Sequence, residues 1–362
     1  MTASAPPSDP IVRVLDGLLQ RRPASLARAV SIVENQRTGF EELLGALHAR
    51  LGRARRIGIT GPPGAGKSTL TTTLAQALRE QGRTVAIVAV DPTSPFTGGS
   101  LLGDRIRMES IALDPGIYIR SLATRGSLGG LSSATRDTAD VLDGAGFDDV
   151  LIETVGVGQS ELDVARVADT TVVVLVPESG DAIQTLKAGL MEIADIYVVN
   201  KADRPGADRL RTDIEVMLGI RGGGGSDEMP GHHGVDLKRI INPARAAREA
   251  ARAPAADRWT APVVRTVASK GDGTAELLGA IDRHADYLAS SGLLRQRRRS
   301  RIRDRVVEAT ERKVRERLWS HDDTRHWLDE QLPALEAGTT TPFAVADALL
   351  SRSGEHLTRT TA

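Results

Sequence analysis

Residues 61–68 read Gly61-Pro62-Pro63-Gly64-Ala65-Gly66-Lys67-Ser68, and this stretch decides the fold. An apolar run at 55–60 precedes it and predicts a buried strand, whereas the segment from Thr69 to Leu78 contains no glycine or proline and predicts a helix. A strand, a glycine-rich loop and a helix N-terminus form an anion cradle, because backbone N–H groups and the helix dipole point at the ligand. Residues 61–69 are therefore expected to bind a nucleoside triphosphate. The Lys67 ammonium is expected at the β- and γ-phosphates and the Ser68 hydroxyl on Mg²⁺.

The composition excludes several classes of function. The chain has 362 residues, zero formal net charge and no cysteine, so disulfides, zinc-thiolate sites and cysteine nucleophiles are ruled out. The neutral balance gives no general attraction to nucleic acid or to an anionic membrane. The first residues lack the charged and apolar regions of a signal peptide, and no apolar stretch approaches the roughly 20 residues needed to span a bilayer. We expect a cytoplasmic protein.

A second motif concerns the base of the nucleotide. The apolar run 196–199 ends in Asn200-Lys201-Ala202-Asp203, which places an N-K-x-D sequence at the carboxyl end of a predicted strand, where parallel sheets bind ligands. Guanine presents two adjacent donors, its ring N1–H and its 2-amino group, and one carboxylate accepts both. Asp203 is therefore expected to select GTP, with Lys201 covering the base and Asn200 bracing the loops.

A third motif concerns the metal and the γ-phosphate. Glu153 ends the predicted strand 149–153, and Gly156 follows, where its N–H is suited to meet the γ-phosphate. Many GTPases carry a water-orienting glutamine directly after this glycine. This chain has Val157 there and Gln159 two residues later, so we expect slow intrinsic hydrolysis that a partner accelerates.

Two further carboxylates complete the expected Mg²⁺ site. Asp91 ends the predicted strand 84–90, and Asp104 follows the glycine-rich stretch 97–103. Either residue also has a purely structural interpretation, Asp91 as a turn residue before Pro92 and Asp104 as a helix N-cap. The candidate metal ligands are Ser68, Asp91, Asp104 and Glu153. The candidate catalytic residues are Lys67, Asp91 and Gly156.

The whole chain has the pattern of an α/β protein. Strands expected at 55–60, 84–90, 117–120, 149–153, 171–176, 196–200 and 263–268 alternate with helical segments. Such alternation predicts a doubly wound, mostly parallel sheet, the core of a P-loop GTPase, with helical N- and C-terminal extensions. The expected divisions are a helical extension at 1–50, a GTPase domain at 51–290 and a helical arm at 291–362.

Two segments lie outside this core pattern. Residues 221–258 are rich in Gly, Ala, Pro and Arg and predict a flexible insertion with a short helix near 243–252. Its His232-His233 pair has no companion ligands, which favours a solvated loop over a metal site. After Gly292 the chain is helical and rich in arginine, but acidic neighbours at helical spacing favour a solvated face over a nucleic-acid surface.

Together these motifs resemble the methylmalonyl-CoA mutase-associated GTPases of the MeaB/ArgK type, from about residue 25 to residue 320. The resemblance is carried by 153–161 (Glu-Thr-Val-Gly-Val-Gly-Gln-Ser-Glu), 97–104 (Thr-Gly-Gly-Ser-Leu-Leu-Gly-Asp) and 125–130 (Arg-Gly-Ser-Leu-Gly-Gly). It implies a dimeric G-protein chaperone of an adenosylcobalamin-dependent acyl-CoA mutase. Such a protein gates cofactor delivery from an adenosyltransferase and protects or reactivates the mutase.

The resemblance also implies a partner-coupling segment at 178–187, with Asp181, Gln184 and Lys187 linking nucleotide state to the mutase. An ordinary strand-to-helix connection capped by Asp181 is the alternative. It further implies that Val267, Ala268 and Ser269 form the loop against the base. The chain departs from the family by having Ile106 and Val267 where a hydroxyl residue is usual, and Glu178-Ser179-Gly180 at the entry to the coupling segment.

Three other functions remain open on sequence grounds. A kinase for a small molecule or protein is one, although no obvious acceptor pocket or catalytic loop is visible. A nickel metallochaperone GTPase is the second, and the lack of cysteine and of a histidine-rich tract disfavours it. A nucleotide-binding scaffold without turnover is the third.

Overall fold

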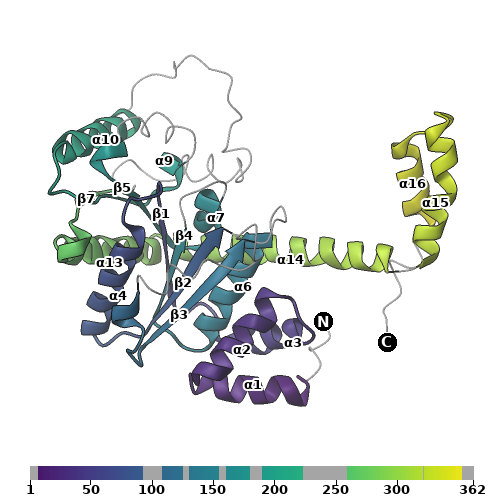
Figure 1. Cartoon of the computed structure of the whole chain (residues 1–362), viewed down its shortest axis with the longest axis horizontal. Coiled ribbons are helices and arrows are strands. Elements are labelled where there is room, and N and C mark those ends of the chain that lie inside the picture. Colours follow the sequence, from purple (N-terminus) through teal and green to yellow (C-terminus); the bar gives the residue numbers. More distant parts are fainter. Residues whose placement is uncertain are drawn as a thin grey trace. The chain divides into compact units, whose positions relative to one another are not determined.

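The computed structural model describes residues 7–92, 108–124, 130–154, 160–179, 190–222, 259–320 and 322–352. The chain divides into two compact units, residues 1–294 and 295–362. The first unit contains the sheet and the helices packed on it, and the second is helical (Figure 1).

A seven-stranded sheet forms the centre of the first unit, and its strands pair in the order β3-β2-β4-β1-β5-β6-β7. The strands are β1 (Arg55–Thr60), β2 (Val85–Pro92), β3 (Ile117–Thr124), β4 (Asp149–Thr154), β5 (Thr170–Leu175), β6 (Ile196–Val199) and β7 (Val263–Arg265). All the pairings between these strands are parallel. The chain continues from β1 toward one edge and later from β5 toward the other, so the carboxyl end of β1 lies at a switch point, where open parallel sheets bind ligands. The predicted doubly wound, mostly parallel fold is confirmed.

Helices cover both faces of the sheet. On one face lie α4 (Lys67–Glu80) and α13 (Thr274–Ser290), whose leucines pack on Ile57 and Ile59 of β1. On the other face lie α6 (Gly130–Gly144) and α7 (Ser160–Val167). Alternation along β1 explains the division: its isoleucines face α4, while Gly58 between them faces α7, where a Cβ would lie 2.6 Å from a methyl of Val164.

The remaining elements of the first unit are short or lie at its periphery. The 3₁₀ turns are η1 (His48–Arg50), η2 (Glu109–Ile111), η3 (Pro177–Ser179) and η5 (Ala268–Lys270). Helices α9 (Leu190–Ile193) and α10 (Ala207–Gly222) form a third apolar cluster with β5 and β6. Because α10 continues through Gly222, the first two residues of the expected insertion are helical. The rest of the insertion, including the helix expected near 243–252, lies outside the described residues.

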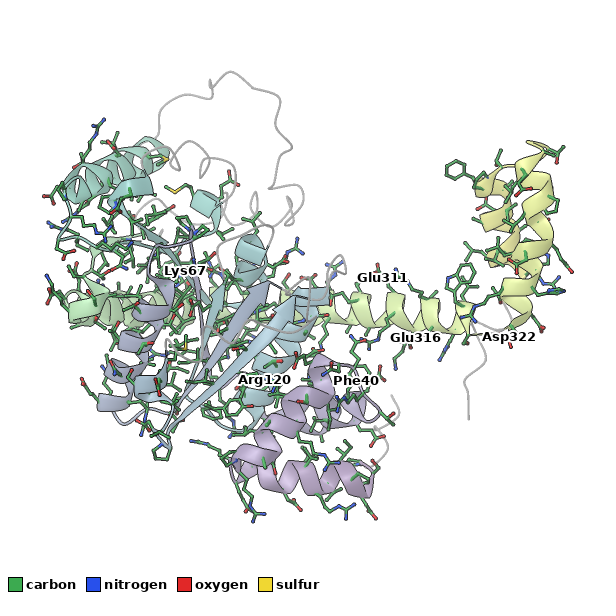
Figure 2. All side chains as sticks on the ribbon, viewed as in Figure 1. Phe40, Lys67, Arg120, Glu311, Glu316 and Asp322 are labelled. Carbon is green, nitrogen blue, oxygen red and sulfur yellow. The ribbon has the colours of Figure 1, made fainter. Side chains whose placement is uncertain are left out.

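Three N-terminal helices extend the α6 side of the core: α1 (Asp9–Leu19), α2 (Pro23–Glu34) and α3 (Phe40–Leu47). Their buried leucines and valines share one cluster with β2, β4 and α6. Arg120 of β3 joins α2 to the edge of the sheet, since its Nη2 donates to Glu34 Oε2 at 2.5 Å and to Ser31 Oγ at 3.2 Å. Figure 2 labels Arg120 between the strand and these helices.

Buried ion pairs lie at the amino-terminal edge of the sheet, where the strands begin. Arg56, in β1, is buried and donates to Asp140 at 2.6 Å and to Asp143 at 3.1 Å. The fully buried Asp143 carboxylate also accepts the backbone N–H groups of residues 52, 53 and 54. Burial by itself lowers the pKa of the Arg56 guanidinium, but the surrounding carboxylates outweigh it and raise that pKa above its ordinary value. The network fixes α6 and the segment before β1 to the sheet.

The second unit is built from helices. They are α14 (Leu293–Trp319), which begins two residues before this unit, α15 (Asp322–Glu336) and α16 (Pro342–Arg352). Helix α14 carries exposed aliphatic side chains at helical spacing, among them Ile302, Val306 and Val314.

Candidate functional site

The phosphate-binding loop lies at the carboxyl end of β1. Gly61, Pro62, Pro63, Gly64, Ala65 and Gly66 connect β1 to α4, and Lys67, Ser68 and Thr69 form the first turn of that helix. Gly61 has a φ of +140°, and a methyl group there would lie 2.1 Å from the Val174 carbonyl oxygen, so only glycine fits. The N-terminus of a fourteen-residue helix thus opens directly onto the loop.

Lys67 is 5 % exposed and sits where the loop meets the helix (Figure 2). Its Nζ donates to the carbonyl oxygens of Gly61 at 2.8 Å and Pro62 at 2.9 Å. These two carbonyl groups orient the ammonium at the start of the helix. The arrangement therefore keeps a positive charge beside the backbone N–H groups of an anion site.

Ser68 and Glu153 meet on the other side of the loop. The Ser68 hydroxyl donates to Glu153 Oε1 at 2.5 Å, and Glu153, near the end of β4, is 6 % exposed. Both contribute oxygen atoms, the ligand type that Mg²⁺ prefers, directly or through water. Two of the four predicted metal ligands are thus brought together, and they fit a magnesium site.

Asn200 ties the two nucleotide motifs together from a buried position. Its Nδ2 donates to the Ala65 carbonyl at 2.8 Å, and its Oδ1 accepts from Thr266 Oγ1 at 3.0 Å and from the Ala268 N–H at 3.1 Å. A Cβ at Gly66 would lie 2.4 Å from the same Nδ2, so glycine makes room for this amide. One side chain therefore sets the spacing between the phosphate loop and the loop after β7.

The predicted base-reading residues lie on two adjacent loops at the ends of β6 and β7. Lys201 has a left-handed φ of 55°, and the Ala202 N–H bonds to the Thr266 carbonyl at 3.0 Å. Asp203 is exposed, and its Oδ2 accepts from Lys270 Nζ at 3.2 Å. That hydrogen bond lowers the pKa of the Asp203 carboxyl below its ordinary value. Val267 and Ala268 are buried beside these residues, whereas Ser269 is exposed.

The structure leaves part of the predicted site untested. Asp91 lies in β2 opposite Ala123 of β3, next to the end of β4, but only its backbone is described. Asp104, Gly156, Asp181, Gln184 and Lys187 lie outside the described residues, as do Ile106, Val157, Gln159 and the His232-His233 pair. Within the described ranges no group of three His, Cys, Asp or Glu side chains is gathered as a metal site.

Sequence reasoning missed several residues that build this site. Thr154 Oγ1 donates to Thr60 Oγ1 at 2.9 Å and joins the ends of β4 and β1 beneath the loop. Thr266 anchors Asn200, and Lys270 pairs with Asp203. Each of these residues ends a strand or follows one, and this position is the one feature of the sequence that could have drawn attention to it. None belongs to a motif that identifies its partner.

The fold and this geometry define a P-loop GTPase: a phosphate loop on a helix N-terminus, a buried asparagine brace and an exposed carboxylate at the end of the N-K-x-D motif. The family profile described as methylmalonyl Co-A mutase-associated GTPase MeaB matches residues 26–323, and the chain belongs to this family. It therefore binds GTP and GDP and hydrolyses GTP. The MeaB/ArgK resemblance seen in the sequence is confirmed.

Individual relatives agree with this assignment. A probable GTPase of Mycobacterium tuberculosis is 40 % identical over 332 residues, covering 90 % of both chains. The mouse protein named methylmalonic aciduria type A homolog, mitochondrial, is 32 % identical over 359 residues, covering 93 % of this chain and 78 % of that one. The crystal structure of an LAO/AO transport system kinase is similar with a TM-score of 0.61 and 26 % identity, covering 96 % of this chain and 99 % of that one.

None of the helices that the structure describes combines the length and apolar character required to cross a membrane.

Proposed function

We propose that this GTPase is a chaperone of an adenosylcobalamin-dependent acyl-CoA mutase, methylmalonyl-CoA mutase or a close relative. It would gate cofactor loading, in exchange with a cobalamin adenosyltransferase, and protect or reactivate the mutase. Membership of a family described by its association with that mutase is the observation that carries the proposal. The name of the mouse relative, which refers to methylmalonic aciduria, points in the same direction.

The site residues have the following proposed roles. Lys67 and the N–H groups of the phosphate loop hold the β- and γ-phosphates, Asp203 accepts the two guanine donors, and Asn200 keeps the loops in register. Ser68, Glu153, Asp91 and Asp104 would hold Mg²⁺, which supplies charge neutralisation at the phosphates. Gly156 would donate its N–H to the γ-phosphate.

Coupling to the mutase is assigned to the segment 178–187, which begins within η3 and includes Asp181, Gln184 and Lys187. Glu178 of η3 forms an ion pair with Arg204, next to Asp203, so the start of that segment is joined to the base-reading loop. This contact supports communication between the guanine site and the partner. The exposed aliphatic stripe of α14 supports a homodimer, which we propose through the C-terminal helices.

The test is GTP hydrolysis by the purified protein, alone and with candidate cobalamin-dependent acyl-CoA mutases, with ATP as the control nucleotide. We expect a slow GTP-specific rate that rises severalfold or more with one mutase. Free phosphate as the only product supports the GTPase cycle. Transfer of phosphate to another molecule, with no response to any mutase, would replace the proposal with a kinase.

A further inference from the structure

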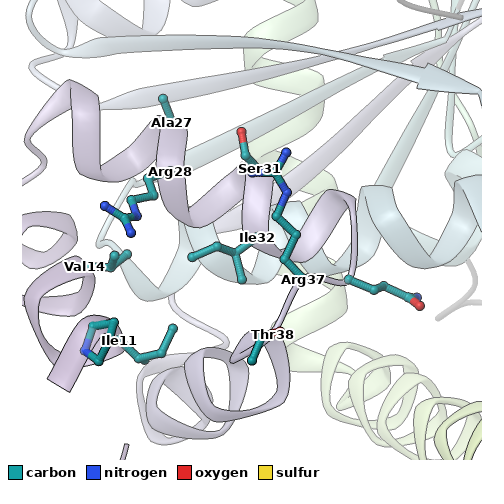
Figure 3. Close-up of a pocket in the computed structure, with 10 residues that line it drawn as sticks. Ile11, Val14, Ala27, Arg28, Ser31, Ile32, Arg37 and Thr38 are labelled. Carbon is teal, nitrogen blue, oxygen red and sulfur yellow. The ribbon is translucent and has the colours of Figure 1, made fainter. Parts of the chain in front are cut away.

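A recess lies among the N-terminal helices, away from the phosphate loop (Figure 3). It has a volume of 810 Å³, within the range of about 300–1,000 Å³ typical of ligand sites. Its floor is apolar: Ile11 and Val14 of α1 and Ile32 of α2 are each at most 8 % exposed. A second recess of 380 Å³ shares Gln36, Arg37 and Thr38 with it and continues over the start of α3. We call the two recesses together the α1–α3 groove.

Two arginines at the rim of the α1–α3 groove have no partner in the part of the chain that the structure describes. Arg28 and Arg37 are exposed, and neither guanidinium makes an ion pair or hydrogen bond there. Two acidic side chains near them in sequence, Glu34 and Glu42, are engaged elsewhere, and a third, Glu41, lines the second recess. Glu34 is bound by Arg120, and Glu42 accepts the N–H and the hydroxyl of Ser8, hydrogen bonds that lower its pKa. The two rim charges are therefore available to an outside group.

One wall of the groove is fixed to the sheet. Ser31 lines the groove and accepts a hydrogen bond from Arg120 of β3, which also holds Glu34 on the same helix. Strand β3 pairs with β2 along its whole length. A wall held in this way is preformed, so an occupant does not have to order it on binding.

We propose that the α1–α3 groove docks a segment of the client mutase that combines aliphatic side chains with one or two carboxylates. This inference rests on the proposed function. Aliphatic side chains match the floor, and carboxylates match the forked donors of Arg28 and Arg37. The groove continues from one recess into the next and carries its charges on an open rim, which suits a protein segment better than an enclosed small molecule.

Reversing the charges of Arg28 and Arg37 tests whether the rim of the groove contributes to mutase binding. We expect R28E/R37E to slow association with the mutase about tenfold or more, and the wild-type rate to fall as salt rises. The matched control is R209E/R283E, a reversal of two exposed arginines on α10 and α13; α10 packs on β7, at the sheet edge opposite β3. Association is measured with the full-length GTPase and the intact mutase, and the unfolding midpoint of each variant verifies folding.

A substitution that fills the groove tests the contribution of its apolar floor, independently of the rim charges. Ala27 lines the groove, so A27W fills it without removing a charge, and we expect affinity for the mutase to fall at least tenfold. Because the chain has no cysteine, T38C gives a single thiol at the groove for a benzophenone crosslinker. The crosslinked mutase peptide should carry Asp or Glu among aliphatic residues.

The possible outcomes distinguish a wrong docking site from a wrong proposed function. If the wild type binds the mutase and both R28E/R37E and A27W bind equally well, the docking site is wrong and the proposed function stands. A crosslink to a basic segment also overturns the docking site. If the wild type binds no cobalamin-dependent mutase, both the proposed function and the docking site fall.

Discussion

The two edges of the same sheet place buried charged side chains in different settings. At the amino-terminal edge, Arg56 meets Asp140 and Asp143, and Arg55 and Arg83 share the fully buried Asp149. At the carboxyl-terminal edge, Lys67 donates to the carbonyl oxygens of Gly61 and Pro62, and Glu153 accepts from the Ser68 hydroxyl. The first edge pairs arginines with carboxylates, and the second gathers its charged side chains around the phosphate loop.

The difference shows that burial of a charged residue does not by itself indicate function. Arg56 and Lys67 lie in β1 and at the start of α4, separated by the phosphate loop, and both are almost fully buried. What distinguishes them is their setting: Arg56 pairs with carboxylates that fix α6 to the sheet, whereas Lys67 donates to two carbonyls of an anion-binding loop. Substitutions at the amino edge should therefore affect stability, and those at the carboxyl edge should affect nucleotide handling.

The largest effect is expected at the amino edge. Asp143→Ala leaves Arg56 without one of its carboxylates and three backbone N–H groups without their acceptor, which should lower the free energy of unfolding by about 3–5 kcal/mol. Urea denaturation measures this. Asp282→Ala is the control, because Asp282 is a half-exposed partner of Arg55 and its loss should cost about 1 kcal/mol or less. Equal small losses for both variants would show that the network at α6 is not structural.

The second effect concerns the opposite edge. Lys67→Ala removes the charge beside the phosphate loop, and we expect kcat/KM for GTP to fall about 100-fold or more. Its free energy of unfolding should change far less than that of Asp143→Ala, since Lys67 donates to two loop carbonyls, whereas Asp143 holds a buried guanidinium and three backbone N–H groups. Steady-state kinetics and urea denaturation on the same variant separate the two quantities. A variant that unfolds readily but retains activity would erase the contrast between the edges.

A smaller effect is expected in the choice of base. Asp203→Asn replaces the carboxylate that we propose accepts two guanine donors with an amide that accepts one, so GTP affinity should fall about 10- to 100-fold. Xanthosine triphosphate, which carries a carbonyl in place of the 2-amino group, should gain affinity. Equilibrium binding of both nucleotides measures the change. Unaltered discrimination would place base recognition elsewhere on the loops.

The smallest expected effect is a shift in the pH dependence of GTP binding. Lys270 lowers the pKa of Asp203, so the carboxylate is protonated at a lower pH than an ordinary aspartate. In Lys270→Met the pKa rises, and GTP affinity should begin to fall at a higher pH than in the wild type, while both proteins bind equally tightly near neutral pH. Titration of binding between about pH 6 and pH 3, the range around the ordinary pKa of an aspartate, measures the displacement. Superimposable profiles would show that the contact does not control Asp203.

Much of the fold could be predicted from the sequence because its signals are local. The seven strands were expected within a few residues of where they lie, and helix α4 follows its loop as expected. The positions at which the strands end were predicted less accurately. Strand β3 runs on to Thr124, and β7 stops at Arg265 because Thr266 and Ala268 turn to meet Asn200. A strand's end depends on its neighbours, which a single segment does not reveal.

By itself the sequence determined the phosphate loop, the N-K-x-D motif and hence the nucleotide class, since each is a short run whose spacing carries its chemistry. Only the tertiary structure decided that Asn200 reaches Ala65, 135 residues away, that Lys270 meets Asp203 and that Arg56 faces Asp140 and Asp143. The unpaired rim of the α1–α3 groove was equally invisible. These contacts join segments that are distant along the chain, and the packing of helices on the sheet, rather than residue spacing, brings them together.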